Sequence, residues 1–258
     1  MSIKKSTQNF YDEYWPQNVP DYTKTREHVL SIVPYRNFLR ILDAGCGTGV
    51  CSLALSDVGK TVVSFDISRG SIGTAEMLSK KLNKTNITFT QGNLLELPFK
   101  NNSFDLVFSW GVIHHTPNPE KALEELVRVL SVNGILVLAV YRKTELTFLH
   151  EIIRKICLKL PKSLKLVVIK SVAGFVGLIG RIKTLNEVRK DNITIEAKIE
   201  DWYFVPEKHF FYIDEMKDLF RKHNMEFELL HEATGRFKST SNFIVRGKKR
   251  GEVDARRN

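Results

Sequence analysis

The sequence is poor in cysteine and in long apolar runs, and each shortage excludes a class of protein. Its 258 residues include only Cys46, Cys51 and Cys157, an odd number without Cys-x-x-Cys spacing, which argues against a disulfide framework or a structural zinc site. No uncharged run reaches the roughly 18 residues that a membrane-spanning helix needs, and the N-terminal segment MSIKKSTQNFYDEYW lacks the apolar stretch of a secretory signal. We therefore expect a cytoplasmic protein that is neither secreted, disordered nor transmembrane and that binds no metal.

Positive charge is plentiful and lies in two segments. The 39 Lys and Arg residues exceed the 29 Asp and Glu residues, for a formal net charge of +10. Residues 150–183 carry a net +7 and residues 246–258 a net +4, so the rest of the chain is close to neutral. Nucleic acid, an anionic membrane or an anionic substrate could each match such charge, which does not choose among them. Residues 250–258 are expected to form a disordered basic tail.

Short β-branched runs alternate with helix-like stretches over residues 39–141. These are LRILDA, VCSLALSDVG, TVVSFDI, SRGSIGTAEMLSKKLN, ITFTQ, FDLVFSW, NPEKALEELVRVL and GILVLAVY, with Asn133-Gly134 as the turn into the last strand. The alternation is typical of a parallel sheet with helices on both faces. Farther on, IDEMKDLFRKHN predicts a helix, and MEFELLHEA and SNFIVRGKK predict an antiparallel strand pair. We expect a doubly wound, Rossmann-like α/β fold with a seven-stranded, mostly parallel sheet.

A glycine-rich turn, DAGCGTG, joins the first predicted strand to the helix that follows. Its backbone amides and the helix N-terminus converge on one spot, and glycine lets a ligand approach the backbone closely. The second strand ends in Asp66, 17 residues after Gly49, where a carboxylate can accept hydrogen bonds from both hydroxyls of a ribose. Together these features predict a site for an adenosine-containing ligand.

Three details of this turn narrow the ligand. The spacing is Gly-x-Gly-x-Gly, no Gly-Lys-Ser/Thr follows, and Asp43 precedes the turn, where an acid would repel a pyrophosphate but suit a cation. ILDAGCGTG resembles the first motif of the class I S-adenosylmethionine-dependent methyltransferases, and VVSFDIS resembles the second. The small-molecule branch with the ubiquinone and menaquinone methyltransferases is the most similar. The resemblance covers residues 39–141 and, more loosely, the C-terminal helix and strand pair.

The resemblance implies roles for the residues of both motifs. Backbone groups of the turn would hold the methionine and ribose portions of S-adenosylmethionine: Gly45, Cys46, Gly47 and Gly49. Asp43 would lie near the methionine ammonium, Asp66 would bind the ribose hydroxyls, and Ile67 would contact the adenine.

Residues 90–110 resemble the third and fourth motifs of the same family. Asn93 stands where an Asp commonly meets the adenine amino group, and an Asn carbonyl oxygen can also accept that hydrogen bond. Leu94 would pack on the adenine, and Trp110 would lie near the sulfonium. The alternative for Trp110 is an ordinary core aromatic.

His114 is the candidate catalytic base. In-line methyl transfer gains most from positioning and needs no metal, and a base helps only when the acceptor must lose a proton. The His114-His115 pair follows the fourth strand, and an imidazole titrates near neutral pH. The alternative is that both histidines only cap a turn or fill the pocket wall. The strand ends in SWGVIH and not in the Asn/Asp-Pro-Pro-aromatic motif of enzymes that methylate nucleic acid bases, which disfavours a nucleic acid substrate.

The N-terminal segment, residues 1–38, is rich in aromatics. In related enzymes such a segment covers the cofactor, so Tyr11, Tyr14 and Trp15 are expected to form a helical lid that excludes water. Packing against the sheet edge is the alternative.

Residues 144–200 form a basic insertion, in the place where this superfamily varies its acceptor pocket. One helical face of LTFLHEIIRKICLKL gathers apolar side chains: Leu149, Ile152, Ile153, Ile156 and Leu160. Two interpretations stay open. The face is buried over the acceptor site as a cap, or residues 146–183 lie in an anionic membrane interface. Both can hold for a lipid-like acceptor.

These observations predict one methyltransferase domain acting on a small or lipid-like acceptor. Its cofactor-binding half is residues 39–143, and residues 201–249 complete the domain after the insertion. We expect a cytoplasmic location with peripheral contact at the inner face of a membrane. The open alternatives are a nucleic acid or protein methyltransferase, an NAD-dependent oxidoreductase, and a cofactor-binding subunit without activity of its own. Neither the acceptor nor the oligomeric state follows from the sequence.

Overall fold

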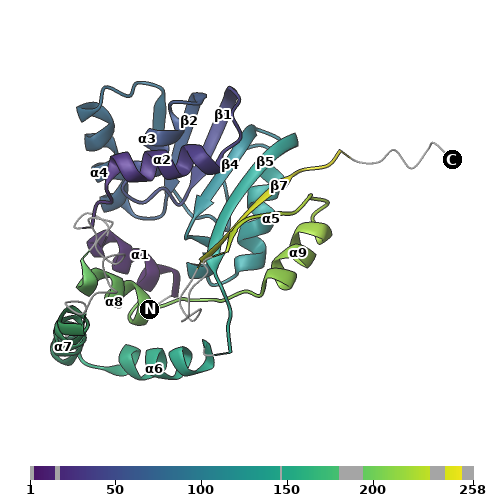
Figure 1. Ribbon diagram of the computed structural model, residues 1–258. Helices are drawn as coiled ribbons and strands as arrows, with labels where there is room; N and C mark the ends of the chain where they lie inside the picture. Colours follow the sequence, from purple (N-terminus) through teal and green to yellow (C-terminus); the bar gives the residue numbers. More distant parts are fainter. Residues whose placement is uncertain (1–2, 15–17, 146, 180–193, 233–241, 252–258) are drawn as a thin grey trace.

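The computed structural model describes residues 3–14, 18–145, 147–179, 194–232 and 242–251. A seven-stranded sheet in the order β3-β2-β1-β4-β5-β7-β6 forms its centre (Figure 1). The strands are β1 Phe38–Ala44, β2 Gly59–Asp66, β3 Ile87–Gln91, β4 Phe104–Trp110, β5 Leu130–Tyr141, β6 Glu228–Glu232 and β7 Asn242–Lys248. The first five are parallel, and β7 pairs antiparallel with both β5 and β6. The predicted fold class is confirmed.

Helices cover both faces of the sheet because successive side chains of each strand point to opposite faces. Leu42 belongs to one core, with α5 (Pro119–Val129) and α9 (Ile213–Lys222), whereas its neighbour Ile41 belongs to the other, with α2 (Tyr22–Ile32) and α3 (Val50–Leu55). The remaining helices are α1 Ile3–Tyr14, α4 Arg69–Lys81, the 3-10 turn η2 Ile113–His115, α6 Thr147–Lys159, α7 Lys162–Ile179 and α8 Ile195–Tyr203.

The start of β5 differs from the prediction. The strand begins at Leu130, which pairs with Phe104, and its pairing with β4 then shifts register. Asn133 adopts a left-handed φ of 62°, and its N–H donates to the Lys249 carbonyl. Asn133-Gly134 therefore forms an irregularity inside β5, not the turn that precedes it.

The insertion forms a small helical layer with a core of its own. That core contains Cys157 of α6, Ile169 and Ala173 of α7, and Ile199 of α8. The predicted apolar face of α6 exists, and its residues Leu149, Ile152, Ile153 and Ile156 are 39–59% exposed. Of the two interpretations left open for this face, burial as a cap over the acceptor site is therefore wrong. The reason is that α6 turns the opposite face, with Arg154 and Cys157, toward the rest of the protein.

Candidate functional site

The glycine-rich turn after β1 has the backbone that its sequence requires. Gly45, Gly47 and Gly49 adopt φ values of 85°, 52° and 76°, which strain any residue with a Cβ. A Cβ at Gly45 would lie 2.3 Å from a methyl carbon of Val112. The amides of Gly45 and Cys46 both donate to the Phe65 carbonyl at the end of β2. The turn is thus fixed against the neighbouring strand, with no space for a Cβ at Gly45 or Gly49.

Asp66 is held at the end of β2 by that same turn. One carboxylate oxygen accepts from the Gly47 N–H at 2.9 Å, and the other accepts from the Ser68 N–H at 2.8 Å. The side chain is buried, and this burial raises the pKa of its carboxyl. Because a carboxylate offers about four lone-pair sites, both oxygens keep capacity for hydroxyl donors from the pocket.

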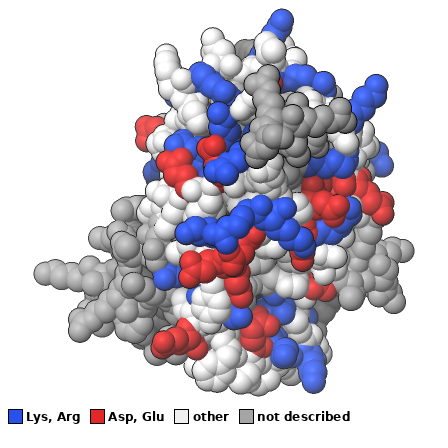
Figure 2. All heavy atoms as spheres, turned by 90° about the vertical axis from the view of Figure 1, so that its right-hand side faces the viewer, with Lys and Arg blue, Asp and Glu red and all other residues white. Residues whose placement is uncertain are grey.

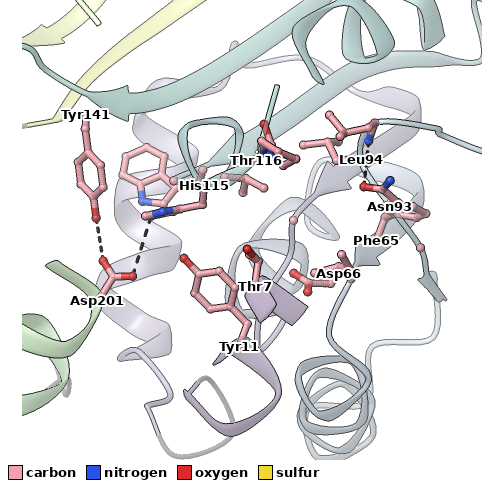
Figure 3. A pocket seen from close by; sticks show the side chains of 18 of the residues that line it. Thr7, Tyr11, Phe65, Asp66, Asn93, Leu94, His115, Thr116, Tyr141 and Asp201 are labelled. Atoms are coloured by element: carbon pink, nitrogen blue, oxygen red, sulfur yellow. Dashed lines mark hydrogen bonds and ion pairs between the residues drawn. The ribbon is translucent and has the colours of Figure 1, made fainter. Parts of the chain in front are cut away.

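A pocket opens at the carboxyl ends of the parallel strands, where ligands of open α/β sheets bind. We call the part of its lining that follows β1 to β5 the sheet wall; Gly45, Asp66, Trp110, His115 and Tyr141 belong to it. The helical wall is formed by Thr7 and Tyr11 of α1 and by Asp201 of α8. Figure 3 shows Asp66 and Asp201 at opposite ends of this pocket, with Thr7 and Tyr11 between them.

Hydrogen bonds attach helix α1 to the start of α4 on one side and to α8 on the other. The Asp12 carboxylate accepts from the Ser68 Oγ at 2.7 Å and from the Gly70 N–H at 3.2 Å, at the start of α4. On the other side, the Tyr14 hydroxyl donates to the Ala197 carbonyl of α8 at 3.3 Å. Tyr11 and Tyr14 are buried, and Trp15 lies outside the described residues.

The structure brings six of the predicted site residues into the sheet wall: Gly45, Asp66, Ile67, Asn93, Leu94 and Trp110. Five others do not line the pocket: Asp43, Cys46, Gly47, Gly49 and His114. Trp110 lines the pocket and also stacks on Phe108 with ring centroids 6.0 Å apart, and its place near the sulfonium stays a prediction. The Asn93 side-chain oxygen accepts from the Leu95 N–H at 3.3 Å and so shapes its own loop.

Asp43 lies behind the glycine-rich turn in a buried polar group. Its carboxylate accepts from the Ser52 hydroxyl, which also contacts the Ser64 hydroxyl. Burial raises the pKa of Asp43 to about 7, although the Ser52 hydrogen bond opposes that shift. The acid is therefore largely protonated below neutral pH.

His114 and His115 have different surroundings although they are adjacent. His114 is fully buried behind the wall against the Tyr141 ring, and neither of its ring nitrogens has a hydrogen-bond partner among the described residues. His115 lines the pocket, with its Nδ1 2.8 Å from the Glu207 carbonyl oxygen. A carbonyl only accepts, so Nδ1 holds the proton and Nε2 keeps a lone pair.

A polar cluster of Tyr11, His115, Tyr141 and Asp201 forms the end of the pocket opposite Asp66. The Tyr141 hydroxyl donates to Asp201 Oδ2 at 2.8 Å, and Asp201 Oδ1 lies 3.9 Å from His115 Nε2. Burial lowers the pKa of His115 to about 4 and, with the Asp201 charge, raises the pKa of both tyrosines. At neutral pH the imidazole is neutral and the phenols stay protonated.

Three residues of the pocket, Thr7, Tyr141 and Asp201, are not among those predicted from the sequence. Tyr141 could have been found, since it is the last residue of a parallel strand, and such residues lie at the edge where ligands bind. Thr7 and Asp201 belong to helices whose contact with the sheet has no local signature in the sequence.

Charged groups outside the pocket are mixed. Figure 2 shows basic side chains beside acidic ones over the face that carries α9 in Figure 1. Ion pairs such as Arg246 with Glu228 at 2.8 Å and Arg221 with Asp218 at 2.9 Å neutralise part of this charge. Within the described ranges, no three His, Cys, Asp or Glu side chains are grouped so that they could hold a metal ion.

Comparisons with known proteins agree with this geometry. Residues 42–138 match the family described as "Methyltransferase domain". The chain is 32% identical over 155 residues to an uncharacterized protein of Methanocaldococcus jannaschii, and 39% identical over 102 residues to a demethylmenaquinone methyltransferase of Lactococcus lactis. These alignments cover 55% and 38% of this chain, and 64% and 40% of the two relatives, so the chain spans only part of their length.

The fold also matches solved structures. The YcgJ protein of Bacillus subtilis superposes with a TM-score of 0.59 at 16% identity, over 89% of this chain and 99% of that one. This likeness is one of fold.

Proposed function

We propose that this chain, whose residues 42–138 match the family described as "Methyltransferase domain", is a class I S-adenosylmethionine-dependent enzyme that transfers a methyl group to a small, lipid-like acceptor. The cofactor is S-adenosylmethionine. The observation that carries the proposal is the two-ended pocket, with a buried carboxylate on a glycine-rich turn at one end and a polar cluster at the other.

The residues at the Asp66 end fit the cofactor. The glycine turn leaves backbone in place of side chains, and Asp66 keeps lone pairs for the two hydroxyls of a ribose. Ile67 and Leu94 offer apolar surface for an adenine ring. When bound, S-adenosylmethionine would supply a methyl group on a positively charged sulfur, so that the acceptor atom bonds to the methyl carbon as the carbon–sulfur bond breaks. Gly47, Gly49 and Cys46 would act by shaping the turn, and Asp43 by supporting it from behind.

The polar cluster fits an acceptor group that carries a hydrogen. His115 Nε2 and Asp201 Oδ1 can each accept a hydrogen bond, and the two atoms lie 3.9 Å apart. A hydroxyl or amine of the acceptor can donate to one or both, so the cluster would position the attacking atom. As the new bond forms, the acceptor proton would pass to His115 Nε2, and the Asp201 charge would stabilise the imidazolium. We therefore assign the role predicted for His114 to His115.

The helical wall supports a small acceptor over a polymer. Helices α1 and α8 contribute Thr7, Tyr11 and Asp201 to the pocket, so they cover it and leave room for a compact molecule. A lid of this kind excludes water from the reacting groups. We propose that α1 acts as this lid and that α8, the last helix of the insertion, completes the acceptor end through Asp201.

Calorimetric titration with S-adenosylmethionine, S-adenosylhomocysteine and NAD tests the cofactor end. We expect both sulfur compounds to bind and NAD not to bind. Asp66→Asn should weaken cofactor binding at least tenfold, because one acceptor oxygen becomes a donor.

Asp105→Asn is the matched control for that titration. The Asp105 carboxylate also accepts from two backbone amides, those of Leu39 and Arg40, but it lies at the opposite end of the sheet. Cofactor affinity should stay unchanged in this variant. A folded wild-type protein that binds neither sulfur compound would contradict the proposal, and binding of NAD would favour an oxidoreductase.

A further inference from the structure

The apolar face of α6 remains without a partner among the described residues. Phe148, Leu149, Ile152, Ile153 and Ile156 follow one face of the helix, and each is exposed, Phe148 by 65% and Ile156 by 59%. Helix α7 adds exposed Leu164, Leu166 and Val167. A helix usually packs such a face against a hydrophobic core, so its exposure indicates that another molecule binds there.

Basic side chains border this face. Lys155 and Lys159 are exposed and lie seven and eleven residues after Phe148, which places them along one edge of the apolar stripe. Lys170 is exposed on α7. The only acidic residue of 147–179 is Glu151, and Arg154 pairs with it at 3.1 Å. The surface therefore combines apolar contact area with positive charge that no acidic side chain of the described residues neutralises.

One helix separates this surface from the pocket. In Figure 1, α6 and α7 form the lower edge of the molecule, with α8 between α7 and α1. Trp202 of α8 lies against His150 of α6, with ring centroids 5.8 Å apart, and the preceding residue, Asp201, lines the pocket. A molecule or membrane that contacts α6 is thus close to the acceptor end of the pocket.

We propose that the α6–α7 surface docks on an anionic lipid bilayer, with the apolar stripe in the interface and the lysines on the lipid headgroups. Apolar side chains on one face and basic ones along its edge are the features that hold an amphipathic helix in such an interface. Among the described residues no helix combines the length and hydropathy needed to cross a membrane. The inference extends the proposed function, since it gives an apolar acceptor a source beside the pocket.

Co-sedimentation with vesicles tests this surface. We expect the full chain to bind vesicles that contain phosphatidylglycerol at least tenfold more tightly than vesicles of phosphatidylcholine alone, and high salt to weaken the binding. The double variant Ile152→Ser/Ile156→Ser should bind the anionic vesicles at least tenfold more weakly than the wild type. The double variant Lys155→Gln/Lys159→Gln should lose most of the preference for anionic lipid.

The matched control removes exposed apolar groups from elsewhere. Leu39 and Met77 are 66% and 60% exposed in β1 and α4, so Leu39→Ser/Met77→Ser should bind vesicles as the wild type does. Equal binding by wild type and the Ile152/Ile156 variant would overturn the inference. So would vesicle-independent self-association that only this variant abolishes, which would mark a second copy as the occupant. Cofactor titration of the same variants separates this outcome from failure of the proposed function, because α6 does not line the cofactor end.

Discussion

The two walls of the pocket hold their groups in different ways. In the sheet wall, the glycine-rich turn and Asp66 are fixed by backbone hydrogen bonds between adjacent strand ends, such as Gly45 and Cys46 to the Phe65 carbonyl. In the helical wall, Thr7, Tyr11 and Asp201 come from helices far apart in sequence and are held by side chains, through contacts such as Tyr141 with Asp201.

This difference suits the sheet wall to binding one cofactor and the helical wall to binding an acceptor. Backbone contacts between neighbouring strands tolerate little change, which suits a site for one cofactor. Side-chain contacts between helices can be altered without disturbing the sheet, which suits an acceptor site. We therefore expect substitutions in the sheet wall to cost stability, and substitutions toward α6 to leave stability nearly unchanged.

The largest effect is expected at Gly45. Gly45→Ala combines a φ of 85° with a Cβ 2.3 Å from Val112, so the free energy of unfolding should fall by about 3 kcal/mol. Gly111→Ala is the control, because its φ of 73° is also positive but no atom lies within 4 Å of the new Cβ. It should cost about 1 kcal/mol, the strain alone. Urea unfolding measures both, and equal losses would show that the turn is not tightly packed.

A smaller, pH-dependent effect is expected at Asp43. Its folded pKa of about 7 exceeds that of an unfolded Asp, so the folded state binds the extra proton between about pH 4 and 7. Stability from this group is therefore lost as pH rises through 7. Asp43→Asn removes the titration, and from pH 5 to 8 the variant should gain about 2 kcal/mol relative to wild type. Urea unfolding at both pH values measures this, and a constant difference would contradict it.

Substitutions in the polar cluster should change the pKa of His115 and leave the fold intact. Burial lowers the pKa of His115 to about 4, while the negative charge of Asp201 opposes that shift. Asp201→Asn should lower this pKa further, and Tyr141→Phe should leave Asp201 with one hydrogen bond fewer. Titration of the imidazole signals by NMR measures both variants, with the more exposed His223 as internal control. An unchanged His115 pKa in Asp201→Asn would show that the two groups do not interact.

The smallest effect is expected on the exposed face of α6. Ile152 is 49% exposed, so Ile152→Ser should change the free energy of unfolding by less than about 0.5 kcal/mol. Leu106→Ala, at a fully buried position of β4, should cost about 3 kcal/mol. Thermal and urea unfolding compare the two. A large loss in Ile152→Ser would mean that this face is covered in the free protein.

The sequence predicts the sheet wall well because its positions follow from local spacing. In a βαβ unit the turn after the first strand and the end of the second lie at one edge, so Gly45 and Asp66 can be placed together from their order alone, whereas Ile67 is predicted only by the resemblance to methyltransferases. Asn93 and Leu94 follow β3 at the same edge. Asp43, Cys46, Gly47 and Gly49 do not line the pocket, and their contacts with the ligand stay predictions.

The remainder depends on geometry that spacing does not contain. Whether His114 or His115 enters the pocket is decided within one 3-10 turn that follows Gly111, whose φ is 73°. Periodicity identified the apolar face of α6 but not what it would meet, because that depends on how the helix docks on α8. Asp201 lacks a sequence signature because its place in the pocket results from long-range helix packing.

The attachment of α1 through Asp12 has a consequence for timing. The Asp12 carboxylate joins α1, which belongs to the helical wall of the pocket, to Ser68 and Gly70 at the start of α4. Ser68 also donates its backbone N–H to Asp66. A cofactor enclosed beneath α1 would have to wait for the two Asp12 bonds to open before it could exchange. We expect release of S-adenosylhomocysteine to limit the rate of turnover, so that tight closure of α1 over the pocket also slows each catalytic cycle.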